Sequence, residues 1–187
     1  MNLMTTQSGT TDEVQQASTE ILFYGSGECA LGKVLIARSD KGVCAILLGD
    51  NERELEVDLA ARFPNATVVA NQIAIRNDLA EVIRFVDQPS DGLHLTLDMR
   101  GTPLQRRMWE AIRGIPVGKT MSYTRVARLI NCVYPKAAAR AVANACAANP
   151  IALAIPCHRV VRSDGDLADY RWGVQRKREL IATEAKT

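Results

Sequence analysis

The pattern of hydrophobic and turn residues changes near Gly101, about halfway along this chain of 187 residues. Before Gly101, short runs of Val, Ile and Leu alternate with glycine-containing turns, and two longer segments have helical spacing. After it, short segments with helical spacing follow one another. One regular architecture does not produce both patterns. We therefore expect an α/β N-terminal domain at residues 20–99 and a mostly helical C-terminal domain at residues 100–187.

Four segments of the N-terminal half have the composition or the alternation of strands: 21–24, 34–38, 43–48 and 93–97. Turns at 25–27 (Gly-Ser-Gly) and 40–42 (Asp-Lys-Gly) separate the first three, which indicates hairpins. Asn51 is a suitable cap for a helix that runs to Phe63. A second helix is predicted over 71–86, where apolar residues recur at helical spacing.

Apolar spacing in the C-terminal half predicts further helices. The first two are predicted from residues that would face inward: Leu104, Met108 and Ile112, then Val126, Leu129 and Ile130 after a cap at Ser122. The third covers 136–148 and forms a helix-turn-helix with the second. Its many alanines permit close packing against either a protein core or a DNA groove, and Arg140 favours the nucleic-acid surface. A last helix begins at Gly173.

The cysteines and histidines indicate neither a metal centre nor a disulfide framework. Five cysteines are scattered without a C-x-x-C pair, and the two histidines, His94 and His158, lie far apart in the sequence. A structural zinc site needs four ligands at close spacing, so we expect no bound metal. The cysteine pattern favours the reducing cytoplasm.

The sequence also predicts no membrane association. No apolar run approaches the roughly 20 residues that span a bilayer. Residues 1–19 are rich in Thr, Ser, Gln and Gly and lack the basic and apolar regions of a secretory signal. We expect them to form a disordered tail.

Charge is divided unequally between the two halves. Residues 1–99 hold 7 Lys/Arg against 15 Asp/Glu, a balance of −8, whereas residues 100–187 hold 16 against 6, a balance of +10. A concentrated basic half on a chain with a net charge of only +2 is typical of nucleic-acid binding. The alternative is an ordinary solvated basic surface.

The basic half contains the sequence Pro156-Cys157-His158-Arg159, which sets a thiol beside an imidazole and a guanidinium. Because the thiolate is the reactive form of cysteine, such neighbours indicate an activated nucleophile. A carboxylate on the last helix, Glu184, is a candidate for the third member of a Cys-His-acid relay. The alternative is a buried structural cysteine at the start of a strand.

Several motifs together resemble the O6-alkylguanine-DNA alkyltransferases, in particular their bacterial Ada-type members. They are Pro156-Cys157-His158-Arg159-Val160, Ser122-Tyr123, Pro135-Lys136-Ala137-Ala138, Arg140-Ala141-Val142, Asn149-Pro150 and Tyr170-Arg171-Trp172-Gly173. The resemblance covers residues 21–184, weakly in the first half and specifically from Gly101 onward. It implies a ribonuclease-H-like N-terminal domain and a winged helix-turn-helix-like C-terminal domain, with residues 162–167 in the wing.

The resemblance further implies direct reversal of DNA damage. Such proteins flip O6-alkylguanine, and by extension O4-alkylthymine, out of duplex DNA and transfer the alkyl group to one cysteine. The thioether product has no easy hydrolytic exit, so the protein is expected to be consumed in one turnover. The implied partner is double-stranded DNA containing O6-alkylguanine, with no cofactor. We expect a monomer in the bacterial cytoplasm, associated with the nucleoid during repair.

Carried over residue by residue, the resemblance gives Cys157 as acceptor and His158 as a base acting through a water. Glu184 would orient His158, and Asn149 would brace the loop before the cysteine.

Tyr123 would press on the phosphate beside the flipped base and donate a hydrogen bond to that base. The remaining expected DNA contacts are Arg140, which would fill the gap in the base stack, Ala138, Ala141, Arg159, Val160 and Ser163. The carbonyls of Cys157 and Val160 would read the guanine amine.

Two residues depart from the family pattern. Asp169 stands where glycine or asparagine is common, and we expect a left-handed backbone there to be strained. Trp172 replaces a glycine of some relatives and is expected to narrow the pocket. Three rival functions remain open: a helix-turn-helix regulator without chemistry, an alkyltransferase-like damage sensor, and a cysteine hydrolase that uses the same thiol.

Overall fold

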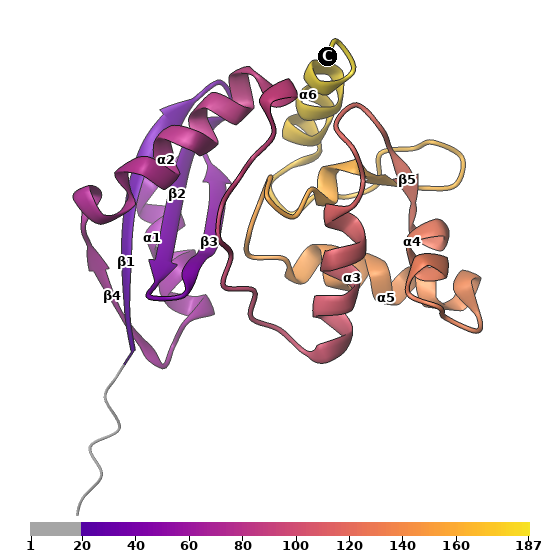
Figure 1. The fold of residues 1–187 in the computed structure, drawn as a ribbon, viewed down its shortest axis with the longest axis horizontal. Helices are drawn as coiled ribbons and strands as arrows, with labels where there is room; N and C mark the ends of the chain where they lie inside the picture. Colours follow the sequence, from indigo (N-terminus) through magenta and orange to yellow (C-terminus); the bar gives the residue numbers. More distant parts are fainter. Residues whose placement is uncertain (1–19) are drawn as a thin grey trace, which may run out of the picture.

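A computed structural model describes residues 20–187 as an α/β protein with a four-stranded sheet, a two-stranded sheet and six α-helices (Figure 1). The tail expected at residues 1–19 lies outside the described residues. None of the helices within residues 20–187 is long and apolar enough to cross a membrane.

The N-terminal half forms the larger sheet with a helix on each face. Its elements are β1 (Glu20–Cys29), β2 (Gly32–Ser39), β3 (Gly42–Gly49), α1 (Glu52–Arg62), β4 (Ala66–Ala70), α2 (Gln72–Asp87) and the 3₁₀ turn η1 (Pro89–Asp91). The strand order is β3-β2-β1-β4, with β1–β2 and β2–β3 antiparallel and β1–β4 parallel. The predicted helices at 51–63 and 71–86 are confirmed, and Asn51 caps α1 by accepting from the backbone N–H groups of Arg53 and Glu54.

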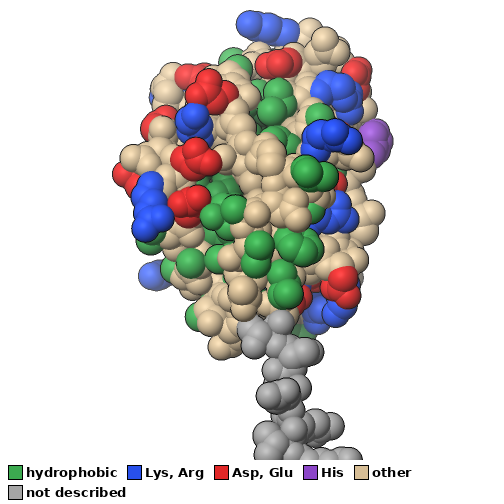
Figure 2. Space-filling model, turned by 90° about the vertical axis from the view of Figure 1, so that its left-hand side faces the viewer, with side chains coloured by type: hydrophobic (Ala, Val, Ile, Leu, Met, Phe, Trp, Pro, Cys, Tyr) green, Lys and Arg blue, Asp and Glu red, His purple; other side chains and the backbone are tan. Residues whose placement is uncertain are grey.

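Strand β4 was not predicted from the sequence. It is an edge strand whose residues are mostly exposed, so no buried face imposes an alternating pattern. The exposed apolar residues Ile21 and Phe23 of β1 and Val69 of β4 lie in the same part of the sheet. Figure 2, which faces this side of the molecule, shows hydrophobic side chains among charged ones.

The predicted turn at 25–27 is wrong, because β1 continues through it to Cys29. The glycines have a packing role instead. A Cβ at Gly25 would lie 2.8 Å from Cγ1 of Ile75, and one at Gly27 would lie 3.2 Å from Cδ2 of Leu79. Both neighbours belong to α2. The glycines therefore allow α2 to lie close on the strand.

The strand predicted at 93–97 is also wrong as a full element. Only one parallel bridge forms, between Val43 and Leu97, with hydrogen bonds from Val43 N to Thr96 O and from Asp98 N to Val43 O. The leucines of this segment are only partly buried and pack against the edge of the core. Their alternation with polar residues reflects an extended connection with one side packed against the core.

The C-terminal half contains α3 (Pro103–Arg113), β5 (Met121–Ser122), α4 (Tyr123–Leu129), α5 (Pro135–Ala148), the 3₁₀ turn η2 (Cys157–Arg159), β6 (Val160–Val161) and α6 (Val174–Glu184). The predicted helices are present, and Ser122 caps α4 by accepting from Arg125 N. Leu104 and Leu129 do not face inward as expected, since they are 46% and 54% exposed. Trp109 fills the core instead and donates from Nε1 to Ala145 O at 2.9 Å.

The segment expected as a wing, 162–167, forms a turn. Arg162 N donates to Asp166 O at 2.9 Å, and Gly165 N donates to Arg162 O at 3.0 Å. Strand β6, directly before it, pairs in parallel with β5.

The two faces of the larger sheet are buried in different cores. One core lies between the sheet and α1 and includes Leu35, Leu47 and Leu59. The other contains residues of the opposite sheet face, such as Ile36 and Ile46, together with buried residues of α2 and the C-terminal half. This second core is continuous across residue 100, so the sheet forms one wall of the C-terminal half.

Backbone hydrogen bonds reinforce this contact. Ile46 N donates to Pro150 O at 3.0 Å, and Ala152 N donates to Ile46 O at 2.9 Å. These bonds attach the chain just before Pro156-Cys157 to the free edge of β3. The N-terminal sheet therefore fixes the starting point of the Cys-His segment.

Replacement of Gly25 by alanine should destabilise the fold, because the new Cβ would overlap Ile75. We expect a loss of about 1–3 kcal/mol in the free energy of unfolding, the usual cost of overpacking a core. Urea denaturation measures this loss. Gly114→Ala is the matched control, since the nearest atom to its added Cβ lies at 3.4 Å and its φ is −72°. Equal stabilities of the two variants would contradict this explanation of Gly25.

Candidate active site

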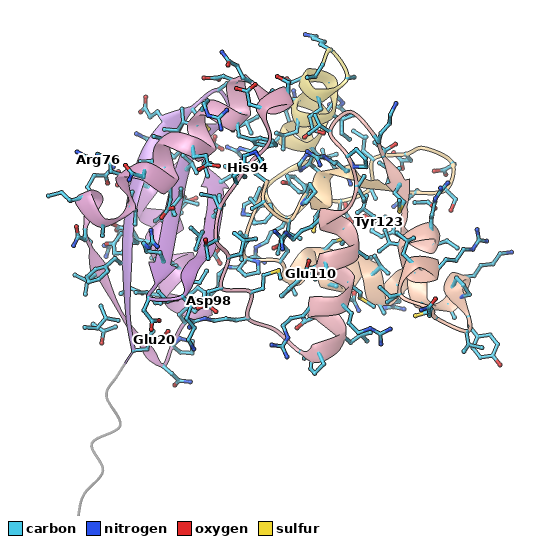
Figure 3. The ribbon with its side chains drawn as sticks, viewed as in Figure 1. Glu20, Arg76, His94, Asp98, Glu110 and Tyr123 are labelled. Carbon is cyan, nitrogen blue, oxygen red and sulfur yellow. The ribbon has the colours of Figure 1, made fainter. Side chains whose placement is uncertain are left out.

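Cys157 lies in η2, a single 3₁₀ turn between Pro156 and β6, and is 2% exposed. Its side chain contributes to the wall of a cavity of about 440 Å³. Tyr123 from the start of α4, small residues of α5 such as Ala143, and the loop that contains Tyr170 form the other walls. Figure 3 shows Tyr123 in the C-terminal half, away from His94 on the segment that joins the halves.

Asn149 braces the segment before the cysteine, as expected. Its Nδ2 donates to Ile155 O at 3.0 Å and to Cys157 Sγ at 3.3 Å, while its Oδ1 accepts from Ile151 N at 2.8 Å. The asparagine is fully buried. Its side chain therefore stabilises the backbone of the loop and also contacts the sulfur of Cys157.

Glu184, at the end of α6, brings its carboxylate to His158 and Arg159. His158 Nε2 lies 2.8 Å from Oε1, and Arg159 donates from Nε to Oε2 at 2.8 Å and from Nη2 to Oε1 at 2.9 Å. All three residues are buried. Burial alone would raise the pKa of Glu184, but the hydrogen bonds from His158 and Arg159 outweigh it and lower that pKa to about 2.

The contact with Glu184 defines the tautomer of His158. An ionised carboxylate only accepts hydrogen bonds, so Nε2 carries the proton. Burial lowers the pKa of His158 despite the opposing effect of Glu184, which favours the neutral ring at neutral pH. In the neutral ring, Nδ1 then holds a lone pair. Among the described residues, this buried Nδ1 has no hydrogen-bond partner, so its lone pair is free to accept a proton.

The environment of Cys157 corrects one expectation. We expected the adjacent histidine and arginine to activate the thiol, but Arg159 points to Glu184 instead. Burial, followed by the nearby thiol of Cys146, raises the pKa of Cys157 well above its ordinary value. Asn149 and the positive charge of Lys177 act in the opposite direction. The resting sulfur is therefore a protonated thiol that needs a base when it reacts.

Lys177 is a buried residue near the site that the sequence analysis did not identify. It is fully buried, and its Nζ donates to Val160 O at 2.6 Å. Burial lowers its pKa. The positions 177, 180 and 184 recur at helical spacing, and all three are buried. This spacing was the sequence signal that could have identified Lys177 as a residue on the inward face of α6.

The expected DNA contacts fall into two groups. Arg140 and Ser163 are exposed, while Ala138 and Ala141 of α5 are partly buried. Tyr123 is also partly buried, and burial raises its pKa to about 12, so it is a hydrogen-bond donor at neutral pH.

Arg159 and Val160 form the second group, and both are buried. The guanidinium of Arg159 is occupied by Glu184 and by Ile115 O, to which Nη1 donates at 2.6 Å. A contact with DNA would require these bonds to open, so the geometry argues against that expectation. The Val160 carbonyl already accepts from Lys177, which leaves one lone pair for another donor.

The loop around Tyr170 corrects both expectations about the departures from the family pattern. The left-handed residue is Ala168, with φ 56°, and Asp169 does not have a positive φ. Trp172 does not line the cavity. It packs edge-on behind Tyr170, with ring centroids 5.2 Å apart, so it acts on the cavity only through the position of Tyr170.

The pKa of Glu184 predicts a pH dependence of stability. Its folded pKa, about 2, lies below the reference value of 4.5, so its stabilising effect is complete above pH 4.5 and disappears as the pH falls towards 2. Glu184→Gln should cost about 3–5 kcal/mol at neutral pH, because Arg159 is left as a buried charge without a counter-ion. The gap between this variant and the original protein should narrow from pH 5 to pH 3 in urea denaturation.

The control for this measurement is Glu179→Gln, which removes an exposed carboxylate from the same helix. Its stability should remain within a few tenths of a kcal/mol of the unchanged protein. A gap for Glu184→Gln that stays constant down to pH 3 would contradict the assigned charge state.

Comparison with known proteins places this geometry in a family. Residues 103–186 match the family model for the 6-O-methylguanine DNA methyltransferase, DNA binding domain. The bifunctional transcriptional activator/DNA repair enzyme Ada of Escherichia coli K12 is 47% identical over 163 residues, which cover 87% of this chain and 45% of Ada. This chain thus spans about half the length of that relative.

Two further matches extend over nearly whole proteins. A probable methylated-DNA–protein-cysteine methyltransferase of Acanthamoeba polyphaga mimivirus is 34% identical over 155 residues, covering 82% of this chain and 97% of its own length. The crystal structure of Mycobacterium tuberculosis OGT in complex with DNA has a TM-score of 0.70 and 28% identity, covering 88% of this chain and 93% of that one. This chain belongs to the family of the methylated-DNA–protein-cysteine methyltransferases.

Proposed function

We propose that this protein repairs DNA by direct reversal: it takes the alkyl group of O6-alkylguanine in duplex DNA onto Cys157 and is consumed by the reaction. One observation carries the proposal. Cys157 lines a cavity, the next residue in the chain, His158, is paired with the buried Glu184, and this pairing leaves the second ring nitrogen of His158 free to accept a proton. The family to which the chain belongs supports the same reaction.

The chemistry follows from the charge states of the site. His158 Nδ1 accepts the thiol proton, through a water as expected from the sequence, and Glu184 stabilises the imidazolium that forms. The charge of Lys177 stabilises the thiolate. The sulfur then attacks the alkyl carbon, so that the S–C bond forms as the C–O6 bond breaks, and the guanine anion that leaves takes up a proton at N1 from solvent. Tyr123 donates a hydrogen bond to the departing base, which makes it a better leaving group.

The reaction ends at the thioether. A thioester would be hydrolysed, whereas a thioether offers no carbonyl carbon for water to attack. One alkyl group per polypeptide is therefore the expected limit, and no cofactor is required.

DNA reaches the cavity over the basic C-terminal half. Small side chains of α5, including Ala138 and Ala141, allow the helix to approach the DNA backbone, and the exposed Arg140 enters the base stack in place of the flipped nucleotide. Ser163 contacts a phosphate. The related Mycobacterium tuberculosis protein crystallised with DNA supports this partner.

The finer description of the fold belongs to the same proposal. Residues 20–99 would form a ribonuclease-H-like domain and residues 100–187 a winged helix-turn-helix-like domain, in which α4 and α5 are the paired helices. We extend the substrates to O4-alkylthymine. We place the protein as a monomer in the bacterial cytoplasm, at the nucleoid during repair.

A cysteine hydrolase would use the same Cys157, His158 and Glu184. Two observations favour the alkyltransferase over it. The thiol has a raised pKa rather than the lowered one of a hydrolase nucleophile. The basic half also has no use in cleaving a protein or an ester. A regulator without chemistry would not need the Glu184–His158 pair.

Mass spectrometry of the digested protein tests the proposal. After incubation with a duplex that contains O6-methylguanine, the peptide with Cys157 should gain one methyl group. Cys157→Ala should gain none and should leave the DNA methylated, while Cys29→Ala, a thiol outside the cavity, should react normally. An unmodified Cys157 peptide together with unrepaired DNA would reject the proposal.

A further inference from the structure

The N-terminal half reaches the wall of the cavity through an ion pair. Arg171, which lines the cavity beside Tyr170, donates from Nη2 to Oδ1 of Asp58 at 2.9 Å and to Oδ2 at 3.3 Å. Asp58 lies on α1, 113 residues earlier in the chain. An element on the far face of the N-terminal sheet thus contacts the loop that encloses the thiol.

Arg171 also binds the end of the alanine-rich helix. Its Nη1 donates to Ala147 O at 3.3 Å, near the C-terminus of α5. The last carbonyls of a helix carry partial negative charge, so this end attracts a guanidinium. Arg171 therefore joins three parts of the molecule: α1, α5 and the cavity loop, defined as residues 168–173.

A second connection holds the next residue of the cavity loop. Arg176 of α6 donates from Nη1 to Trp172 O at 3.0 Å and from Nε to Leu31 O at 2.7 Å, and it also pairs with Asp50. Leu31 and Asp50 both belong to turns of the N-terminal half. The cavity loop is thereby linked to that half at two adjacent residues, through the side chain of Arg171 and the carbonyl of Trp172.

The cavity loop has few other attachments. Its internal backbone bond runs from Gly173 N to Tyr170 O at 2.9 Å, and Ala168 has a left-handed conformation. Within residues 20–187, the buried Tyr170 hydroxyl has no hydrogen-bond partner. The ring of Tyr170 is thus positioned by edge-on packing against Trp172 and His158 and by its neighbour Arg171, rather than by a polar contact of its own.

We propose that Asp58 is a positioning residue for alkyl transfer: through Arg171 it holds the cavity loop, and with it the Tyr170 wall, in the arrangement that receives the flipped base. This inference deepens the proposed function and rests on it. It gives α1 a specific role in the reaction, although α1 does not contribute to the cavity itself.

In the competing interpretation, Arg171 pairs with Asp58 only in the absence of DNA and binds a phosphate group when DNA is present. The two interpretations predict opposite effects of Asp58→Asn. A positioning role predicts slower transfer from bound DNA with an unchanged dissociation constant for DNA. A phosphate contact predicts tighter DNA binding with an unchanged rate of transfer, because Arg171 is released.

Single-turnover transfer from a duplex with O6-methylguanine, at saturating protein, separates these effects. Both partners are about one-third exposed, 34% for Asp58 and 32% for Arg171, so the pair is of modest strength. We expect Asp58→Asn to lower the rate by about two- to fivefold. A rate equal to that of the unchanged protein, with or without tighter DNA binding, would overturn the proposal.

Two comparisons exclude indirect causes. Asp58 also accepts from Arg62 Nε at 3.0 Å, so Asp58→Asn is repeated in an Arg171→Gln background, where it should have no further effect on the rate. A persistent effect would assign the loss to Arg62 and overturn the proposal. Asp78→Asn removes a different ion pair, in which Arg38 Nη1 of β2 lies 2.6 Å from Asp78 Oδ2 of α2. This pair does not involve the cavity loop, so the variant should not change the rate.

Hydrogen exchange gives a readout that does not depend on repair. The amides of the cavity loop should exchange faster in Asp58→Asn than in Asp78→Asn. Failure of the unchanged protein to transfer a methyl group would reject the proposed function alone. Unchanged exchange in the cavity loop, together with an unchanged rate, would reject the role of Asp58 alone.

Discussion

The buried carboxylate of Glu184 is the interaction on which the site depends. It accepts hydrogen bonds from His158 and Arg159, and its burial makes both contacts costly to break. Through Arg159, which also binds Ile115 O, the carboxylate links the end of α6 to the turn that carries Cys157 and to the chain after α3. One group thereby fixes the backbone of the site and the proton state of its base.

The position of the thiol follows from elements that are distant in sequence. The edge of β3 binds the backbone at residues 150–152, and Asn149 locks the same segment from within. A chain held in this way enters η2 in one direction, so Cys157 faces the cavity. The contacts of Glu184 then hold His158 and Arg159, the two residues after Cys157. The larger sheet is therefore a structural part of the active site, although its strands do not line the cavity.

The electrostatics of the site suit a protein that acts once. A thiol with a raised pKa is protected from unwanted reactions at rest, since the thiolate is the reactive form. In the proposed reaction, neutral His158 would accept the thiol proton, and the charge of the buried Lys177 would stabilise the thiolate. These groups favour formation of the thiolate when the substrate is in place, rather than a permanently activated sulfur.

The sequence predicted the helices and three of the strands, because capping and periodicity are local signals, and the Pro-Cys-His-Arg motif singled out Cys157, which lines the cavity. It failed where long-range packing decides the outcome. Gly25 looked like a turn residue because its contact with α2 lies outside its own segment. Arg159 was expected to contact DNA and Lys177 was not identified, because burial of a charged side chain becomes visible only with its partners, here Glu184 and Val160. The pairing of Asp58 with Arg171 could not be predicted from local sequence signals for the same reason.

The number of alkyl groups removed per polypeptide tests the central claim most directly. Repair of a large excess of duplex DNA containing O6-methylguanine is followed until it stops, with the active protein concentration known from thiol titration. A single-use acceptor gives a plateau at one methyl group removed for each polypeptide, with no recovery on prolonged incubation. Continued repair beyond that plateau would show that the sulfur is regenerated and would contradict a single-use acceptor.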